Sequence, residues 1–261
     1  MTPPNLFDRY ARRLRRDRAL RIGGLPFIHE RAFLELLDRL GDVRRGFDRT
    51  LLIGCLQADW RKRLEARVGE VFIAEPSPVA ARACGGIVAD EDRLPFADGS
   101  FDLVICVGTL DSVDDLPGAL LLARRILNPG GLFLAAMSGA GGLSQLRTAM
   151  LAADALGGGA AARMHPAIDV RTAGDLLARA GLEILLADVE VIDVTYETLT
   201  ALVADLRAHG ATNCLVRRSR MPLTRAAFAA ASAEFARLGT SGRTTEQIQI
   251  VYLSGWAPPE A

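Results

Sequence analysis

The chain has 261 residues, of which 50% are hydrophobic, and its 31 basic and 31 acidic residues cancel to a formal net charge of zero. This length and composition predict one sizeable core, most simply a single domain with an insertion, and argue against a second independent domain. The balanced charge creates no overall field that would attract nucleic acid or an anionic membrane, and no apolar run is long enough to span a bilayer.

Two helices are expected before the first strand. Residues 5–21 carry seven arginines, and Leu6, Phe7, Tyr10 and Leu14 fall at helical spacing. This pattern predicts a solvated helix that one apolar stripe holds to the core, and the alternative is a binding arm for an acidic partner. The second helix, over residues 26–40, has a predicted core face of Phe33, Leu36, Leu37 and Leu40. Residues 1–45 together are predicted to form an N-terminal helical arm.

Three short strands follow, at residues 50–54, 71–74 and 86–89. The second strand ends in Glu75 and the third in Asp90, so each predicted strand is followed by an acidic residue. The carboxyl ends of parallel strands meet at one edge of a sheet, where ligands bind in open α/β folds. We therefore expect these two acids at a ligand site.

Residues 90–137 predict a complete right-handed crossover unit of a parallel sheet. Residues 101–107 are apolar except for Asp102, as is typical of a central strand covered on both faces. Asp115 and Pro117 indicate the start of a helix that runs to Leu127. A turn at residues 128–131 and a buried strand at residues 132–137 complete the unit.

Residues 138–180 are predicted to form a helical insertion above the ligand edge. It contains a helix over residues 143–156, a hinge at Gly157-Gly158-Gly159 and a helix near residues 172–180. The insertion is either a substrate cap or a passive lid. A strand at 182–196, helices at 199–209 and 226–238, and a strand at 246–255 follow.

The four cysteines are isolated, and the start of the chain does not resemble a signal peptide. Cys55, Cys84, Cys106 and Cys214 form no C-x-x-C pair, and no histidine stands at metal-ligand spacing, so we expect reduced thiols and no metal site. The polar, arginine-rich first residues lack the apolar segment of a secretory signal. The expected location is cytoplasmic.

The segment LPFADGSFD at residues 94–102, followed by a buried strand, an acidic-Leu-Pro helix start and LNPGG, resembles class I S-adenosylmethionine-dependent methyltransferases. The resemblance implies a Rossmann-like α/β fold: a seven-stranded, mostly parallel sheet with one antiparallel strand and helices on both faces. Residues 46–261 would form this methyltransferase-like domain, and S-adenosylmethionine would be the cofactor.

Such a cofactor makes three demands on the sheet. The first loop must let the backbone approach the ligand, a carboxylate after strand two must bind the ribose hydroxyls, and a polar residue after strand three must meet the adenine. Glu75 and Asp90 meet the second and third demands. The predicted cofactor-binding residues are Gly54, Cys55, Glu75, Pro76, Asp90, Glu91 and Val107.

The first loop departs from the family pattern L-D-L-G-C-G-x-G. Leu52 replaces the acid, and Leu56 and Ala58 replace the second and third glycines, so that only Gly54 is retained. One lost charge-assisted hydrogen bond costs on the order of 1.5 to 3 kcal/mol, roughly a ten- to hundredfold loss of affinity. Retained, weakened and lost cofactor binding therefore all stay open.

Further stretches narrow the resemblance. FDRYARRLRRDRA, GGLSQLRTAM, ADLRAHGATNCLVRRSR and QIVYLSGWAP are similar to bacterial relatives of a mitochondrial assembly factor for respiratory complex I, which is described as a protein-arginine hydroxylase. The malonyl-carrier-protein methyltransferase of biotin synthesis is a more distant resemblance. Family members usually have a His-Trp or similar pair after strand four, where this chain has Asp111-Ser112, so no catalytic base is carried over.

The main hypothesis is an S-adenosylmethionine-dependent methyltransferase that acts on a small molecule, a carrier-bound group or a protein such as a complex I subunit. Hydroxylation of an arginine and a non-catalytic binding role are the alternatives. His165 and His209 are candidate polar groups, for which satisfied or surface histidines are the favoured interpretation. The basic turn comprising Arg207, Asn213, Arg217 and Arg218 either is solvated, the favoured interpretation, or contacts a protein substrate or an acidic small molecule.

Overall fold

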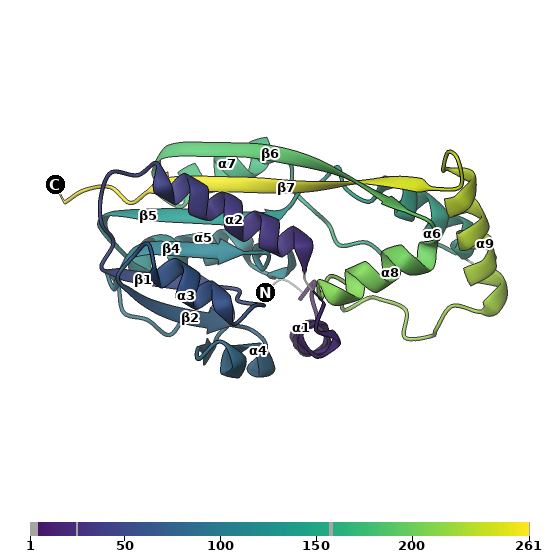
Figure 1. The fold of residues 1–261 in the computed structure, drawn as a ribbon, viewed down its shortest axis with the longest axis horizontal. Coiled ribbons are helices and arrows are strands. Elements are labelled where there is room, and N and C mark those ends of the chain that lie inside the picture. The colour runs from purple at the N-terminus through teal and green to yellow at the C-terminus, as the bar shows by residue number, and fades with distance from the viewer. Residues whose placement is uncertain (1–4, 25, 157–158, 261) are drawn as a thin grey trace.

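The computed structural model describes residues 5–24, 26–156 and 159–260 and is dominated by one sheet flanked by helices (Figure 1). The sheet has seven strands in the order β3-β2-β1-β4-β5-β7-β6. β7 runs antiparallel to both β5 and β6, and the other neighbouring strands are parallel. The strands are β1 (Arg49–Ile53), β2 (Glu70–Glu75), β3 (Ile87–Val88), β4 (Phe101–Val107), β5 (Leu127–Ser138), β6 (Glu183–Tyr196) and β7 (Thr244–Trp256). The predicted fold class is confirmed.

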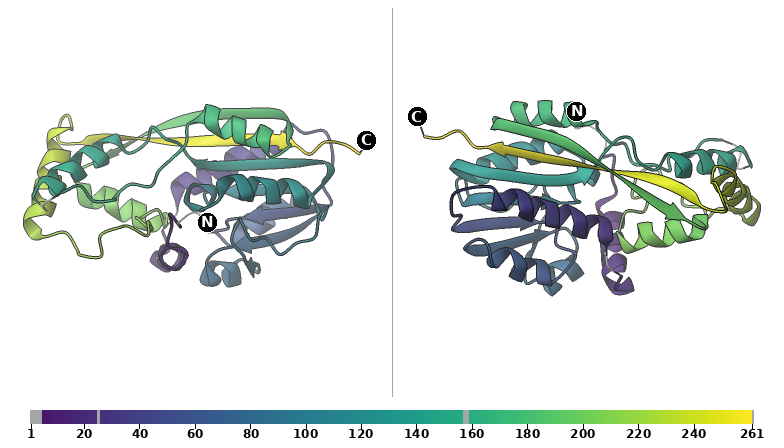
Figure 2. Two further views of the ribbon diagram at one scale, coloured as in Figure 1. Left: turned by 180° about the vertical axis from the view of Figure 1, so that it is seen from behind. Right: turned by 45° about the horizontal axis from the view of Figure 1, so that its top comes forward.

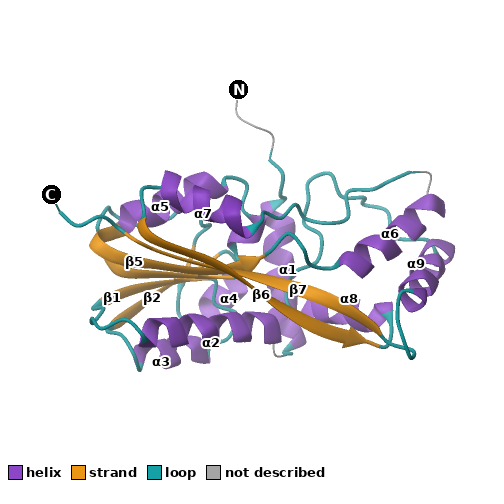
Figure 3. Cartoon of the chain, turned by 90° about the horizontal axis from the view of Figure 1, so that it is seen from above, coloured by secondary structure: helices purple, strands orange, loops and turns teal. Residues whose placement is uncertain are grey.

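Helices cover both faces of the sheet (Figure 3). Those in the described part of the chain are α1 (Arg9–Ile22), α2 (Phe27–Gly41), α3 (Asp59–Glu65), α4 (Pro78–Ala83), α5 (Leu116–Ile126), α6 (Ser144–Leu156), α7 (Val170–Arg179), α8 (Leu199–Ala208) and α9 (Arg225–Arg237). α2 and α3 pack on one face and α5 and α7 on the other. The predicted core face of α2 is buried, as expected.

The central strand β4 contributes side chains to both cores. Leu103 and Ile105 pack beneath α2 and α3, whereas Val104 and Cys106 pack beneath α5 and α7. Successive side chains of a strand point to opposite faces, so a strand covered on both sides must be apolar throughout. This explains the nearly unbroken apolar run of β4.

The segment after α5 differs from the prediction. The expected turn at residues 128–131 belongs to β5, because Leu127 already pairs with Phe101 before a shift in register. Asn128 Nδ2 donates to Asp102 Oδ1 at 2.8 Å, and Gly130 N donates to the carbonyl of Ala257 at 3.0 Å. These bonds hold a proline- and glycine-containing segment in the strand.

The long strands β6 and β7 carry a second cluster of helices beyond the end of the sheet (Figures 1 and 2). α6, α8 and α9 enclose a separate apolar cluster there, which we call the cap; its buried members include Leu146, Tyr196, Leu202 and Phe235. α7 was predicted within the same insertion above the ligand edge of the sheet. It packs instead against β6, β7 and α5. Of the predicted hinge, Gly157 and Gly158 lie outside the described residues.

A buried acid attaches the cap to the sheet. Glu246 in β7 is fully buried, and its carboxylate accepts from the backbone N–H groups of Gln145, at 3.2 Å, and Leu146. These amides belong to the first turn of α6, where N–H groups lack partners within the helix. Across the described ranges, no helix combines the length and the apolar character needed to cross a bilayer.

Candidate functional site

Glu75 stands at the carboxyl edge of the sheet, between the ends of β1 and β3. It is the last residue of β2 and is completely buried. Its Oε2 accepts from the backbone N–H of Cys55 at 2.9 Å, and its Oε1 accepts from that of Ser77 at 3.0 Å. Two fixed backbone donors therefore orient the carboxylate, one from the loop after β1 and one from the N-cap of α4.

Gly54 allows the loop after β1 to lie against the end of β4. Its φ is +84°, and a Cβ at this position would lie 2.4 Å from both the Cγ2 of Thr109 and the carbonyl oxygen of Val107. Only glycine meets both conditions. The following residues Cys55 and Leu56 are buried. The one retained glycine of the family pattern is thus the one that this close approach requires.

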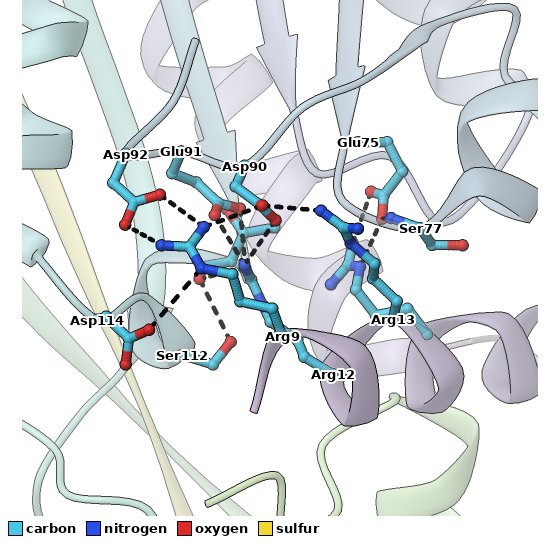
Figure 4. A network of polar contacts seen from close by, with 12 residues as sticks. Arg9, Arg12, Arg13, Glu75, Ser77, Asp90, Glu91, Asp92, Ser112 and Asp114 are labelled. Carbon is cyan, nitrogen blue, oxygen red and sulfur yellow. Dashed lines mark hydrogen bonds and ion pairs between the residues drawn. The ribbon is translucent and has the colours of Figure 1, made fainter. Parts of the chain in front are cut away.

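Three consecutive acids follow β3 on the same edge. Asp90 and Glu91 are 5% and 1% exposed, and Asp92 lies beside them (Figure 4). Asp90 Oδ1 is buried and has no hydrogen-bond partner among the described residues. With Glu75, these residues form an acidic rim at the ends of β2 and β3.

Helix α1 places an arginine against each part of this rim (Figure 4). Arg16 binds Glu75 through two bonds, Nε to Oε1 at 2.6 Å and Nη2 to Oε2 at 2.8 Å. Arg12 binds both oxygens of Glu91 at 2.8 Å and also donates to the Thr109 carbonyl.

The other rim acids are paired as well. Asp90 Oδ2 lies 2.8 Å from an Arg13 nitrogen and 2.9 Å from an Arg9 nitrogen. Arg9 also pairs with Asp92. Burial opposes the charge of Arg12, but the adjacent Glu91 carboxylate raises the pKa of this guanidinium above its ordinary value. The rim is therefore neutralised by charges from the same chain.

The predicted orientation of α1 is wrong. Arg12 and Arg16 are only 4% exposed, whereas Tyr10 and Leu14, expected in an apolar stripe, are 72% and 45% exposed. Of that stripe, Phe7 is buried, and it precedes the helix. The interior acids outweigh the apolar periodicity because an unpaired buried carboxylate would be far more costly than an exposed leucine. The helix thus turns its charged face inward.

A cavity of about 360 Å³ lies between the rim and the cap. Arg12 and Arg16 form part of its wall, Gly108 and Ser138 mark the ends of β4 and β5, and Met150 and Leu202 come from the cap. Asp111 also lines it and accepts a 2.7 Å hydrogen bond from Ser138 Oγ. The cavity therefore has polar groups at the sheet, and its cap side is mostly apolar, with Arg147 and Asp205 as charged members.

All three histidines of the chain line this cavity. His209 is satisfied: it contacts the Asp205 carbonyl through Nδ1 at 2.7 Å and accepts from Ile28 N through Nε2 at 3.1 Å. His165 accepts from Cys214 N at 2.9 Å. The interpretation of these two as satisfied histidines agrees with the structure.

His29 was not predicted. Its ring lies against Gly108, where a Cβ would come within 2.2 Å of Nε2, and its buried Nδ1 has no partner among the described residues. Burial, the neighbouring His209 and Arg16 lower the pKa of His29 to about 3. His29 therefore places a neutral imidazole at the end of β4.

Acidification should destabilise the protein through His29. Its pKa is about 3 when folded and about 6.5 when unfolded, so between these values the unfolded state binds more protons and stability falls as the pH falls. At pH 5 the loss relative to pH 7 is roughly 2 kcal/mol for this residue. Urea unfolding at pH 7 and pH 5 should show a smaller decrease for His29→Gln than for the unchanged protein, and equal decreases would contradict the assignment.

The structure brings the predicted cofactor residues together at one edge. Gly54, Cys55 and Pro76 flank Glu75, and Val107 ends β4 beside them. Their role in cofactor binding stays a prediction. Arg12, Arg16, His29 and Thr109 were missed. Within the described ranges, no group of three or more His, Cys, Asp or Glu side chains is placed to hold a metal ion.

The comparisons with known proteins agree with this fold. A family model described as a methyltransferase domain matches residues 51–135. Mitochondrial arginine-hydroxylase NDUFAF5 of Danio rerio is 31% identical over 98% of this chain and 84% of its own length. Malonyl-[acyl-carrier protein] O-methyltransferase of Laribacter hongkongensis is 34% identical over 68% of this chain and 58% of its own.

A solved structure shows the same fold at low identity. Phosphoethanolamine N-methyltransferase 2 of Haemonchus contortus, in complex with S-adenosyl-L-methionine, has a TM-score of 0.52 and 14% identity, covering 87% of this chain and 52% of that one. The predicted resemblances are confirmed.

Proposed function

The chain belongs to the family of the arginine-hydroxylase NDUFAF5, whose fold is that of S-adenosylmethionine-dependent methyltransferases, and from this premise we propose that it is itself an S-adenosylmethionine-dependent methyltransferase. One observation carries the proposal: Glu75, oriented by two backbone amides at the end of β2, shares one rim with Asp90 at the end of β3. The family resemblance implies that ribose and adenine bind at these positions.

The hydrogen-bonding groups at this rim match those that S-adenosylmethionine would require. Beyond its bond to a backbone amide, each Glu75 oxygen has a second acceptor site, held in this structure by Arg16, that a ribose hydroxyl would use once Arg16 is displaced. Asp90 Oδ1 accepts no hydrogen bond in the described part of the chain, although an Arg12 nitrogen lies 3.9 Å away, and it would accept from the adenine amino group. Gly54 and Cys55 would face the methionine part with their backbone. When bound, S-adenosylmethionine supplies an electrophilic methyl group.

The substrate would enter the cavity between rim and cap. His29 and Asp111 would provide polar groups at its sheet end, and the cap side chains would provide mostly apolar contacts. This lining suits a protein side chain or a small molecule with an apolar part. We place the protein in the cytoplasm, with a complex I subunit as a candidate substrate.

Calorimetric titration with S-adenosylmethionine tests the proposal. We expect the unchanged protein to bind, and Glu75→Gln to bind roughly ten- to hundredfold more weakly, because it removes a charged acceptor from the ribose site. Glu70→Gln is the matched control, because Glu70 is exposed at the opposite end of the same strand and should leave binding unchanged. Absence of heat at millimolar cofactor, both here and in a variant that removes Arg16 from Glu75, would remove the methyltransferase proposal.

Hydroxylation of an arginine is the second candidate. It is favoured by the near full-length similarity to proteins named arginine-hydroxylase, at 31% and 32% identity over 98% and 97% of this chain. Mass spectrometry of complex I subunits from a deletion strain tests it, and the expected signature is the loss of one oxygen mass from an arginine. An unmodified pattern in both strains would contradict it, and a partner captured without any modification would support a binding role.

A further inference from the structure

Arg16 offers Glu75 two adjacent hydrogen-bond donors, as the two neighbouring hydroxyl groups of a ribose would. Its Nε and Nη2 donate side by side to the two carboxylate oxygens at 2.6 and 2.8 Å. The remaining acceptor capacity of these oxygens is used by Cys55 N and Ser77 N. Two adjacent ribose hydroxyls would need the acceptor sites that Arg16 occupies. A guanidinium and a ribose therefore cannot bind Glu75 in this way at the same time.

Arg12 closes the neighbouring part of the rim. It pairs with Glu91 and donates to the Thr109 carbonyl, at the end of β4. Both arginines also form part of the cavity wall, and Arg16 Nη1 lies 3.3 Å from the Gly108 carbonyl. The two side chains thus stand between the cavity and the carboxylates, and their withdrawal would expose Glu75 and Glu91 to the cavity.

The contacts of α1 are compatible with a helix that can detach from the sheet edge. Its buried apolar side chains are only Ala11 and Ala19, because its larger apolar residues, among them Tyr10 and Leu14, face outward. Buried ion pairs contribute little net stability, since the desolvation of both charges offsets their attraction. The segment before α1 has a separate attachment: Leu6 and Phe7 donate backbone bonds to Asp114, and Phe7 packs on Leu215.

We propose that α1 is an autoinhibitory element whose Arg16 and Arg12 compete with the nucleoside part of the cofactor for the rim carboxylates. This proposal rests on the proposed function, because it concerns the same cleft. Binding then requires α1 to withdraw, and the apparent affinity is reduced by the fraction of molecules in which α1 is open. The same movement would extend the substrate cavity to the rim carboxylates.

Calorimetry with S-adenosylhomocysteine compares the unchanged protein with Arg16→Gln. We expect the variant to bind about tenfold more tightly or better, since it removes the competitor and keeps Glu75. Arg18→Gln is the matched control: Arg18 lies on the exposed side of α1, where it donates to Thr212, and its loss should leave the affinity unchanged.

Limited digestion with trypsin gives a second measurement that does not depend on the variant. S-adenosylhomocysteine should accelerate cleavage after the arginines of residues 9–22 in the unchanged protein, with the released peptides identified by mass spectrometry.

Equal affinities with an unchanged cleavage rate would overturn the autoinhibitory role while leaving the proposed function intact. Weaker binding by Arg16→Gln would also overturn it, because Arg16 would then be a ligand of the cofactor. Failure of both proteins to bind would instead remove the proposed function, and the competition with it.

Discussion

Replacing Glu91 with alanine is expected to lower the free energy of unfolding by about 3 to 5 kcal/mol. Glu91 is 1% exposed and holds Arg12, itself 4% exposed, through two bonds of 2.8 Å. Without the carboxylate, the Arg12 guanidinium either stays buried without a counter-charge or becomes solvated, which requires α1 to move away from the sheet. Urea unfolding followed by circular dichroism measures the loss.

A double variant separates the charge effect from the packing effect. Arg12→Met combined with Glu91→Leu should recover most of the lost stability, because hydrophobic replacement of a whole buried ion pair is often neutral or stabilising. The exposed pair of Arg61 and Glu65, 3.0 Å apart, is the control, and Glu65→Ala should cost about 1 kcal/mol or less. If Glu65→Ala and Glu91→Ala lowered the free energy of unfolding by similar amounts, burial of the pair of Arg12 and Glu91 would not explain its contribution to stability.

Gly54→Ala should be the most damaging glycine replacement near the rim. A left-handed conformation costs a residue with a Cβ about 1 to 2 kcal/mol, and forcing extra atoms into a packed site adds about 1 to 3 kcal/mol. Here the new methyl group would meet the backbone carbonyl of Val107 and the side chain of Thr109, each 2.4 Å away. We therefore expect a total loss of about 2 to 5 kcal/mol, measured by chemical denaturation.

Gly23→Ala is the matched control for the conformational part of this loss. Gly23 has a φ of +70°, close to that of Gly54, but a Cβ there would meet nothing within 4 Å. Its replacement should cost only the left-handed part, about 1 to 2 kcal/mol. If Gly54→Ala and Gly23→Ala are equally destabilised, the close approach of the loop to β4 does not add to the cost of replacing Gly54.

The central part of the fold could be predicted from local sequence because its signals are local. The apolar run of β4 gives the bounds of the strand, and Asp115, as predicted from its position before Pro117, caps α5 by accepting from Gly118 N. The extension of β5 back to Leu127 could not be predicted in this way. It depends on bonds to Asp102 and Ala257, which are distant in sequence.

The orientation of α1 could not be predicted because its determinants are not in the helix. Apolar periodicity indicated an inward face with Tyr10 and Leu14, but the partners that turn the arginines inward lie 59 and 79 residues away, for Arg16 and Arg12 respectively. The i, i+4 spacing of Arg12 and Arg16 is the only local sign that they share a face. His29 was missed for a similar reason, because its neighbour Gly108 lies at the end of a strand whose contacts with α2 emerge only in the folded sheet.

The order of strands bears on how the protein is made. In the described sheet, β6 is hydrogen-bonded to β7 alone, and β7 is also what joins β6 to β5. Because ribosomes deliver the chain from its N-terminus, the nascent protein carries β6, α8 and α9 with a full row of unpaired strand amides until β7 is synthesised. Such an edge invites pairing with other chains, so β6 is an aggregation hazard in the nascent chain until β7 pairs with it.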